Sequence, residues 1–251
     1  MTAPTEPISQ TYPQIRTVGV DGLLVSFAGE LTEAANRAAL AFRAAVDAER
    51  WDAVEETTTS LVSTYLRYDL RHGDPATLTA KLTALMVSRD WYAADMPEGR
   101  RLWRIPTAYG PPLAPQLAEA AEAAGLSAEE ALRTLSETRV RVQAIGFAPG
   151  QPYLGSLPPA WNIPRQTALT KQVPIGALTV AIRQFVLFTV TAPTGWRHVG
   201  QTAITLFRPE LDTPFVLRPG DEALFVPTSP EALARMQADG PDGGATSEPI
   251  K

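Results

Sequence analysis

GFAPGQPYLGSLPPAWNIPR, residues 146–165, is too rich in glycine and proline to form a helix or a regular strand. Within its first ten positions these residue types occur at Gly146, Pro149, Gly150, Pro152 and Gly155. Such a run predicts a loop of fixed shape, and shaped loops on rigid scaffolds are where binding residues concentrate. The sequence on either side of the loop must therefore supply the scaffold.

The loop lies inside a segment without acidic residues, which runs from Thr138 to Pro209 although the chain has 27 Asp and Glu. Its basic residues are Arg139, Arg141, Arg165, Lys171, Arg183, Arg197 and Arg208. A local positive charge on a chain of net charge −5 is typical of a site for a carboxylate or phosphate, although basic residues are more often solvated surface. A general base or an acidic metal ligand would have to come from outside this segment.

Composition restricts the function classes further. A hydrophobic content of 45% and a charged content of 20% are typical of a soluble globular protein with one large domain or two ordinary ones. No apolar run approaches the roughly 20 residues of a membrane span, and the first residues do not resemble a signal peptide. Without cysteine there is no disulfide or thiolate nucleophile. We expect a cytoplasmic protein that binds neither membrane nor nucleic acid, and we predict no metal site.

Proline content divides the chain near residues 97–115, since 17 of the 23 prolines fall between Pro97 and Pro230. In the first part, two apolar runs flank Asp21-Gly22, which predicts a hairpin. Helices are predicted over residues 32–50 and after Asp74-Pro75, and a strand over residues 61–68. These elements predict a ferredoxin-like α+β domain over residues 15–100, after a disordered N-terminus of residues 1–14.

The second part begins with a strand at residues 101–105 and continues with two predicted helices. The first covers residues 114–124, and the second starts at the capping box Ser127–Glu130. Short strands separated by turn signals follow, over residues 139–145, 177–182, 185–191, 202–206, 215–217 and 223–227. This spacing predicts a β-barrel over residues 101–230 and an overall α+β class. The Gly/Asp/Ser-rich residues 231–251 predict a flexible tail.

The motifs of the second part resemble those of the allophanate hydrolase subunit 1 family, in order and spacing. That family also includes the sporulation-kinase inhibitor KipI and PxpB, a subunit of bacterial 5-oxoprolinase, and the resemblance covers about residues 15–230. The motifs are RIPTAYG (104–110), GFAPGQPYLGSLP (146–158), IPR (163–165), VPIG (173–176), PTGW (193–196), VGQT (199–202), LFRP (206–209) and PGDEALFVP (219–227).

The resemblance implies that the barrel is cyclophilin-like and that the chain is a subunit of an ATP-dependent amide-ring hydrolase such as 5-oxoprolinase. The ligand would be a small carboxylate-bearing lactam. The implied partners are a KipA/PxpC-type second barrel subunit and a PxpA-type third subunit. We expect no cofactor on this chain, with ATP bound elsewhere, because the sequence has no P-loop or GxGxxG motif. Two alternatives remain: a KipI-like inhibitor of a histidine kinase, or a carboxyltransferase or allophanate hydrolase component.

The chain departs from the family pattern around the loop. Members usually have GFxPGFPYLGGLP, whereas here Gln151 replaces the second Phe and Ser156 replaces a Gly. In TVAIRQFVLFT, residues 179–189, Thr179, Ile182 and Val186 stand where glycine is usual. Larger residues at glycine positions remove close backbone approach to a ligand. The pocket is therefore either remodelled for another ligand or inactive.

We predict a ligand pocket from six residues: Pro149, Gly150, Tyr153, Arg165, Lys171 and Gln184. The three loop residues alternatively form a rigid turn that packs the barrel. Arg165 is the anion-binding candidate because a guanidinium grips a carboxylate at two points, or it bonds loop carbonyls instead. Lys171 would add charge to the same anion or lie on the surface. Gln184 would contact the ligand or pair a strand end as a buried amide.

Three further residues complete the prediction. His198 is a candidate for proton transfer, although a lone histidine in a turn is usually passive. Trp161 and Phe188 are predicted to anchor a second protein chain, because aromatic residues concentrate binding energy at interface centres. The alternative for both aromatic residues is the core of the barrel.

Overall fold

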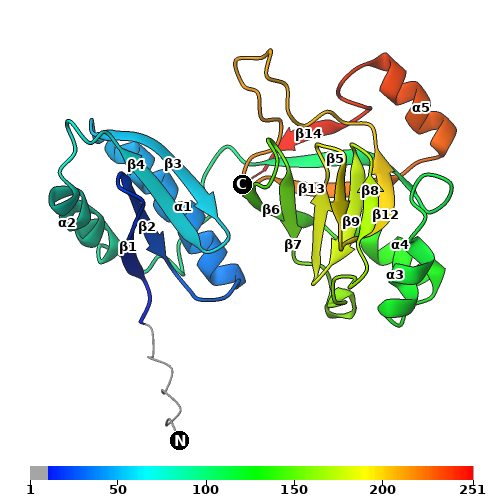
Figure 1. Cartoon of the computed structure of the whole chain (residues 1–251), viewed down its shortest axis with the longest axis horizontal. Coiled ribbons are helices and arrows are strands. Elements are labelled where there is room, and N and C mark those ends of the chain that lie inside the picture. The colour runs from blue at the N-terminus through cyan, green and yellow to red at the C-terminus, as the bar shows by residue number, and fades with distance from the viewer. Residues whose placement is uncertain (1–10, 251) are drawn as a thin grey trace, which may run out of the picture. The chain divides into compact units, whose positions relative to one another are not determined.

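The computed structural model describes residues 11–250, which divide into two compact units between Pro97 and Glu98 (Figure 1). The sequence prediction places this division at residue 100. Most of the predicted disordered N-terminus lies outside the described residues, and its last residue, Gln14, begins the first strand.

The first unit, within its described residues, is a four-stranded antiparallel sheet with two helices, in strand order β1-β2-β4-β3. Because β4 lies between β2 and β3, which α1 connects, the sheet has the split β-α-β arrangement of ferredoxin-like folds. The sequence prediction missed β3. The elements are β1 (Gln14–Val18), β2 (Gly22–Ser26), α1 (Glu33–Glu49), β3 (Val54–Ser60), β4 (Ser63–Tyr68) and α2 (Pro75–Met86).

Both helices of this unit begin where their capping residues predict. The Thr32 side chain accepts a hydrogen bond from the backbone N–H of Ala35, and Asp74 does the same for Ala76 and Thr77. The apolar stripe of α1 is buried in the core of the unit, with Phe42 edge-on to Phe27 at a ring-centroid distance of 5.4 Å. Local capping and helical periodicity therefore account for the two helices of this unit.

The second unit is a closed barrel that, in the described part of the chain, contains seven strands. The strand order is β6-β13-β5-β12-β9-β10-β7, and β7 pairs with β6 to close the barrel. Only β13 and β5 pair in parallel in this circuit. The strands and helices are β5 (Arg101–Tyr109), α3 (Leu117–Ala123), α4 (Ala128–Glu137), β6 (Val140–Ile145), β7 (Pro152–Gly155), β8 (Thr170–Val173), β9 (Ala177–Ala181), β10 (Gln184–Leu187), β11 (Ala192–Thr194), β12 (Arg197–Thr202), β13 (Glu222–Pro227), α5 (Pro230–Asp239) and β14 (Thr246–Pro249).

The structure corrects the prediction of a flexible tail, because residues 231–251 include most of α5 and all of β14. Ser229 caps α5, with Pro230 at its first position. Strand β14 pairs antiparallel with the first residues of β5, and the Ile250 N–H donates to the Arg100 carbonyl at 3.0 Å. The edge of β5 that β12 leaves free thus binds a segment whose composition alone indicates disorder (Figure 1).

The Gly/Pro loop enters β7 through a turn that packing holds in place. The N–H of Gly146 donates to the Gln151 carbonyl at 3.0 Å, and the N–H of Gln151 donates to the Ala148 carbonyl at 3.1 Å. Gly150 has φ +71°, and a Cβ there would lie 3.2 Å from the Leu206 carbonyl oxygen. The turn therefore has the fixed shape predicted from its composition.

Strands β8 and β11 pair in a separate two-stranded sheet beside the barrel. Side chains from this sheet and from β9 and β10 form a second apolar cluster, distinct from the barrel core. The cluster contains Val173, Ala177, Ala181, Val186, Phe188, Ala192 and Trp196.

Candidate functional site

Tyr153 and Arg165, two of the predicted pocket residues, line one pocket of about 150 Å³ at the edge of the second apolar cluster. Strands β7, β10 and β11 and the loop segments beside them supply its walls. The lining residues are Phe147, Gln151, Tyr153, Arg165, Leu169, Val186, Phe188, Pro193, Thr194, Gly195 and Trp196. We call this the Arg165 pocket.

Arg165 is the cation of this pocket. Its guanidinium carbon lies 6.0 Å from the ring centroid of Trp196, and its side chain is exposed. No acidic residue lines the pocket, and within residues 11–250 no ion pair engages Arg165. A guanidinium over an aromatic face, without a carboxylate partner, is suited to a small anion.

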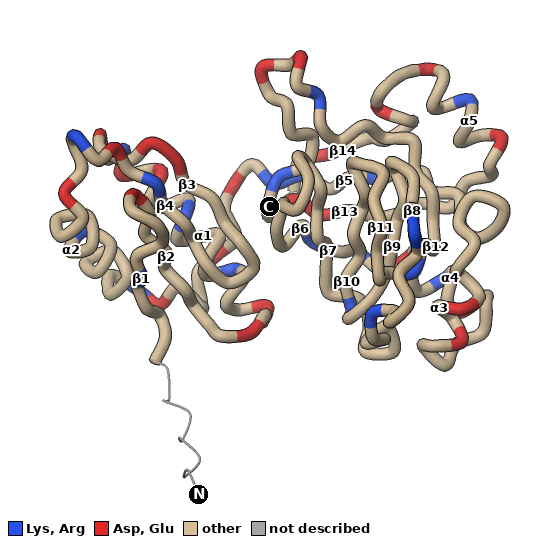
Figure 2. The backbone as a smooth tube through the Cα atoms, in the orientation of Figure 1, with Lys and Arg blue, Asp and Glu red and all other residues tan. Residues whose placement is uncertain are grey.

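Part of the positive charge of the acid-free segment is neutralised in the folded structure. Three of its arginines form ion pairs with carboxylates from other segments: Arg139 with Glu222, Arg197 with Glu119, and Arg208 with Asp242. Arg183 donates to the Leu157 carbonyl at 2.9 Å. Strands β9, β10 and β11 carry no acidic position in Figure 2, so no carboxylate from these strands neutralises Arg165.

Aromatic and apolar side chains form the walls of the Arg165 pocket. Tyr153 packs edge-on against Trp196, with ring centroids 6.2 Å apart. Val186 and Phe188 are buried beneath them, whereas Phe147 at the rim is 76% exposed. The pocket therefore offers a flat or cyclic apolar body a place beside the cation.

The other predicted pocket residues lie elsewhere. Pro149 lines a separate cavity of about 250 Å³ with Phe207, and Gly150 packs against Leu206. Lys171 is exposed on β8 and does not line the Arg165 pocket. These positions agree with the structural alternatives for the turn and with a surface lysine.

The structure also corrects the predicted ligand contact of Gln184. Its Nε2 donates to Gln143 Oε1 at 2.7 Å, and both side chains are buried. Gln184 faces Gly155 of β7 in the ladder, where a Cβ on the glycine would meet the Gln143 amide at 2.7 Å. Gln184 is therefore part of a buried amide pair between strands and does not line the Arg165 pocket.

The structure also corrects the two predicted interface anchors. Trp161 has no exposed surface and lies in the barrel core, where its Nε1 donates to Thr134 Oγ1 at 3.1 Å. Phe188 is 5% exposed within the second apolar cluster. Both aromatic side chains are buried in the apolar cores of this unit, so neither offers exposed surface to a partner.

His198 lies on β12 and is 4% exposed. Burial lowers the pKa of its imidazole below the ordinary 6.5, although the Gly200 backbone and the Gln201 side chain act in the opposite direction. Its Nε2 is buried and has no hydrogen-bond partner among the described residues. His198 does not line the Arg165 pocket, so its position on β12 does not support the predicted proton transfer.

The buried His198 predicts a pH dependence of stability. Below about pH 6.5 the unfolded chain protonates this histidine while the folded chain resists protonation, so the unfolded state binds more protons. We therefore expect the free energy of unfolding to fall as the pH is lowered through 6.5, and His198→Gln to remove part of that fall. Urea unfolding between pH 8 and pH 5 measures it, with His72→Gln, at an exposed histidine, as the matched control. An identical slope in wild type and His198→Gln would contradict the assignment.

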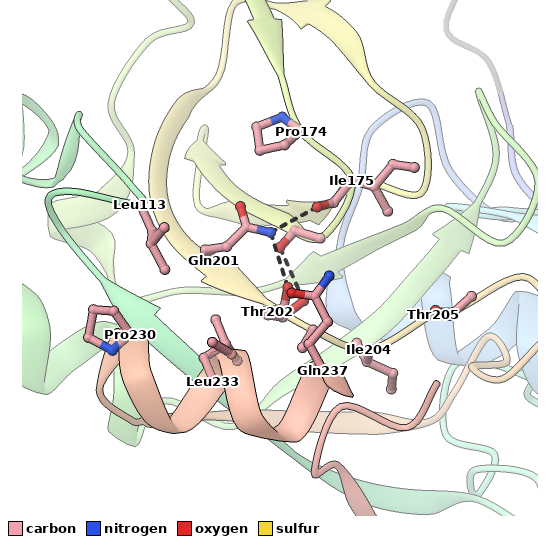
Figure 3. Close-up of a pocket in the computed structure, with 13 residues that line it drawn as sticks. Leu113, Pro174, Ile175, Gln201, Thr202, Ile204, Thr205, Pro230, Leu233 and Gln237 are labelled. Carbon is pink, nitrogen blue, oxygen red and sulfur yellow. Dashed lines mark hydrogen bonds between the residues drawn. The ribbon is translucent and has the colours of Figure 1, made fainter. Parts of the chain in front are cut away.

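A larger cleft of about 530 Å³ lies elsewhere on the second unit, between α5 and the turn that precedes β9 (Figure 3). Helix α5 forms one side with Leu233 and Gln237, and Pro174 and Ile175 lie on the opposite side. The Gln201 amide between them donates to the Ile175 and Thr202 carbonyls. No charged residue lines this cleft, so it has no group to grip an anion, and we place the candidate site at the Arg165 pocket.

Gln151 and Trp196 are pocket residues that sequence reasoning did not assign. Trp196, which the sequence marks only as part of the PTGW motif, is 6% exposed and lines the pocket while almost fully buried. Gln151 was noted only as a departure from the family pattern. A polar residue within an apolar motif was the available signal for it.

Two other features are absent from the described residues. In residues 11–250 no group of three or more His, Cys, Asp or Glu side chains is arranged to hold a metal ion. Among the helices of the same residues, none has the length and apolar character of a membrane span.

Comparison with known proteins connects this architecture to a family. The model for the carboxyltransferase domain, subdomain C and D, matches residues 13–217. The B-subunit of 5-oxoprolinase from Bacillus subtilis (strain 168) is 29% identical over 220 residues, which are 85% of this chain and 92% of the relative. The protein of the same name from Escherichia coli O157:H7 is 39% identical over 131 residues, 52% of this chain and 60% of the relative.

Two solved structures contain a similar fold. TTHA0988 superposes with a TM-score of 0.70 at 30% identity, over 84% of this chain and 40% of that one. The urea amidolyase of K. lactis superposes with a TM-score of 0.72 over 94% of this chain and 16% of that one. At 16% identity the second likeness shows the fold alone. The chain thus spans less than half the length of these solved structures.

Proposed function

The chain belongs to the family of the carboxyltransferase domain, subdomain C and D, and on that premise we propose that it is a subunit of a 5-oxoprolinase-like complex. Its part in that complex is to bind a small carboxylate-bearing lactam in the Arg165 pocket. The match to the Bacillus subtilis 5-oxoprolinase component over 92% of that protein supports the assignment to such a complex. The observation that carries the ligand class is Arg165, a cation without an ion pair in residues 11–250, at the rim of an aromatic pocket.

The remaining parts of the reaction lie on other chains in this proposal. TTHA0988 contains a unit like this one within a longer chain, which supports a second component beside it. The partners we propose are a KipA/PxpC-type barrel subunit and a PxpA-type subunit. ATP binds to one of these, because the present sequence has no recognised phosphate-binding loop.

The first test is carboxylate binding by Arg165→Gln. A charge-assisted contact between a guanidinium and a carboxylate contributes about 1.5–3 kcal/mol, so we expect 5-oxoproline to bind roughly 10- to 100-fold more weakly. Isothermal titration of the chain co-purified with its partner subunits measures the change. Lys171→Gln, at an exposed cation outside the pocket, is the matched control and should bind as wild type does.

The second test is turnover by the assembled complex. With the full set of subunits we expect ATP-dependent release of glutamate from 5-oxoproline, reduced by Arg165→Gln and unaffected by Lys171→Gln. No turnover across several lactams, or equal ligand affinity in wild type and Arg165→Gln, would contradict the proposal.

A further inference from the structure

Gln151 is an unusual residue for the floor of the Arg165 pocket. Its side chain is 1% exposed, yet it lines the pocket together with Val186 and Phe188. Buried amides normally use both their donor and their acceptor groups. The Gln151 Oε1 accepts from the backbone N–H of Thr189 at 3.4 Å, whereas no hydrogen bond within residues 11–250 uses Nε2.

The orientation of the Gln151 amide follows from that contact. A backbone N–H can only donate, so the end of the amide beside Thr189 must be the oxygen. The group left for a ligand is therefore the Nε2 donor. The hydroxyl of Thr189, which lines the separate cavity with Pro149, is also buried without a hydrogen-bond partner in the described part of the chain.

The backbone of Gln151 is held as firmly as its amide. Its N–H and carbonyl are both bonded within the 146–151 turn, and Gly150 before it packs against Leu206. Such a donor is in place before a ligand arrives, and a preorganised group discriminates between ligands more strongly than a mobile one.

The residues that line the pocket are mostly apolar, with a charged side chain at Arg165 and neutral polar side chains at Gln151 and Thr194. Arg165 at the rim carries the only charge among the residues that line it, and Gln151 at the floor offers a neutral donor. Tyr153, Phe188 and Trp196 supply aromatic surface to the same pocket. A neutral donor suits a carbonyl oxygen and gives no ion pair to a second carboxylate.

We propose that Gln151 is a specificity-determining residue that recognises a neutral carbonyl oxygen of the ligand through Nε2. The ligand class is a small monocarboxylate whose carboxylate binds Arg165 and whose amide or ketone carbonyl binds Gln151. This inference rests on the proposed function, since it assumes the carboxylate at Arg165.

The experiment compares three ligands on the chain co-purified with its partner subunits. 5-Oxoproline has both groups, cyclopentanecarboxylate lacks the carbonyl, and 2-pyrrolidinone lacks the carboxylate. We expect wild type to prefer 5-oxoproline over cyclopentanecarboxylate by about 10- to 100-fold, because the analogue without the carbonyl leaves one buried donor without a partner. Gln151→Leu should bring the ratio near one without weakening cyclopentanecarboxylate, and Gln172→Leu, at an exposed glutamine on β8, should keep the wild-type ratio.

A measurement on wild type keeps the proposal testable if Gln151→Leu does not fold. In nitrogen-15 NMR spectra, the Gln151 side-chain amide should shift on addition of 5-oxoproline and stay unchanged with cyclopentanecarboxylate. Equal affinity of wild type for these two ligands, or an unchanged ratio in Gln151→Leu, would overturn the role of Gln151 while carboxylate binding through Arg165 stands. Failure of every carboxylate to bind would overturn the proposed function as well.

Discussion

The Trp161→Ala substitution is expected to lower the free energy of unfolding of the barrel unit by about 3–5 kcal/mol. Trp161 is completely buried in the barrel core, and the Arg183 N–H donates to its carbonyl at 2.9 Å. Close-packed cores relax only in part around a deleted side chain, so a cavity remains. Urea unfolding followed by near-ultraviolet circular dichroism measures the loss.

Phe147→Ala is the matched control for this substitution. Phe147 is an aromatic residue that is 76% exposed, so its loss should change the unfolding free energy by no more than about 0.5 kcal/mol. If Trp161→Ala kept wild-type stability but weakened assembly with a second protein chain, the core assignment would be wrong and the interface prediction would be restored.

Asp221→Ala is expected to lower the unfolding free energy of the same unit by about 3 kcal/mol, the lower end of the range for a broken buried ion pair. Asp221 is 2% exposed, and its Oδ2 lies 2.6 Å from Arg101 Nη2. The same oxygen accepts from Trp103 Nε1 and from the Arg218 N–H. The carboxylate thus joins the first residues of β5 to the turn before β13, and its removal leaves several donors unpaired.

The effect is limited because Arg101 remains 24% exposed and water can solvate part of it. Glu248→Ala is the control, since Glu248 forms an exposed ion pair with Arg104 at 3.2 Å and should contribute less than about 1 kcal/mol. Equal urea midpoints for Asp221→Ala and Glu248→Ala would show that the buried carboxylate has no special role.

Local signals in the sequence predicted α1, α2, α3 and α4, whereas α5 lies in the segment predicted to be a flexible tail. Thr32, Asp74 and Ser127 cap α1, α2 and α4 because each side chain accepts from a backbone N–H two or three residues along. The fixed Gly/Pro turn followed in the same way, from the φ angle that Gly150 requires. These features depend on neighbours in the chain, so the sequence contains the information that they need.

Short strands were predicted less well for a physical reason. Strands β7, β8 and β11 have four residues or fewer, and β7 pairs with β10 and β8 with β11, which are segments that lie apart in the sequence. Strand β14 forms because the edge of β5 is available, which no local pattern of residues 246–249 reveals. Closure of the barrel also depends on the antiparallel pairing of β6 with β7 and not on the strand propensity of either segment.

The candidate site shows the same division. Residue type and motif order sufficed to select Tyr153 and Arg165 as pocket residues and to indicate the family of the chain. The burial of Trp161, the pairing of Gln184 and the shared pocket of Gln151 and Arg165 depend on how segments pack across the unit. Burial and charge neutralisation are properties of three-dimensional neighbours. Only the tertiary structure therefore separated the one cation of the pocket from the arginines that carboxylates elsewhere in the chain neutralise.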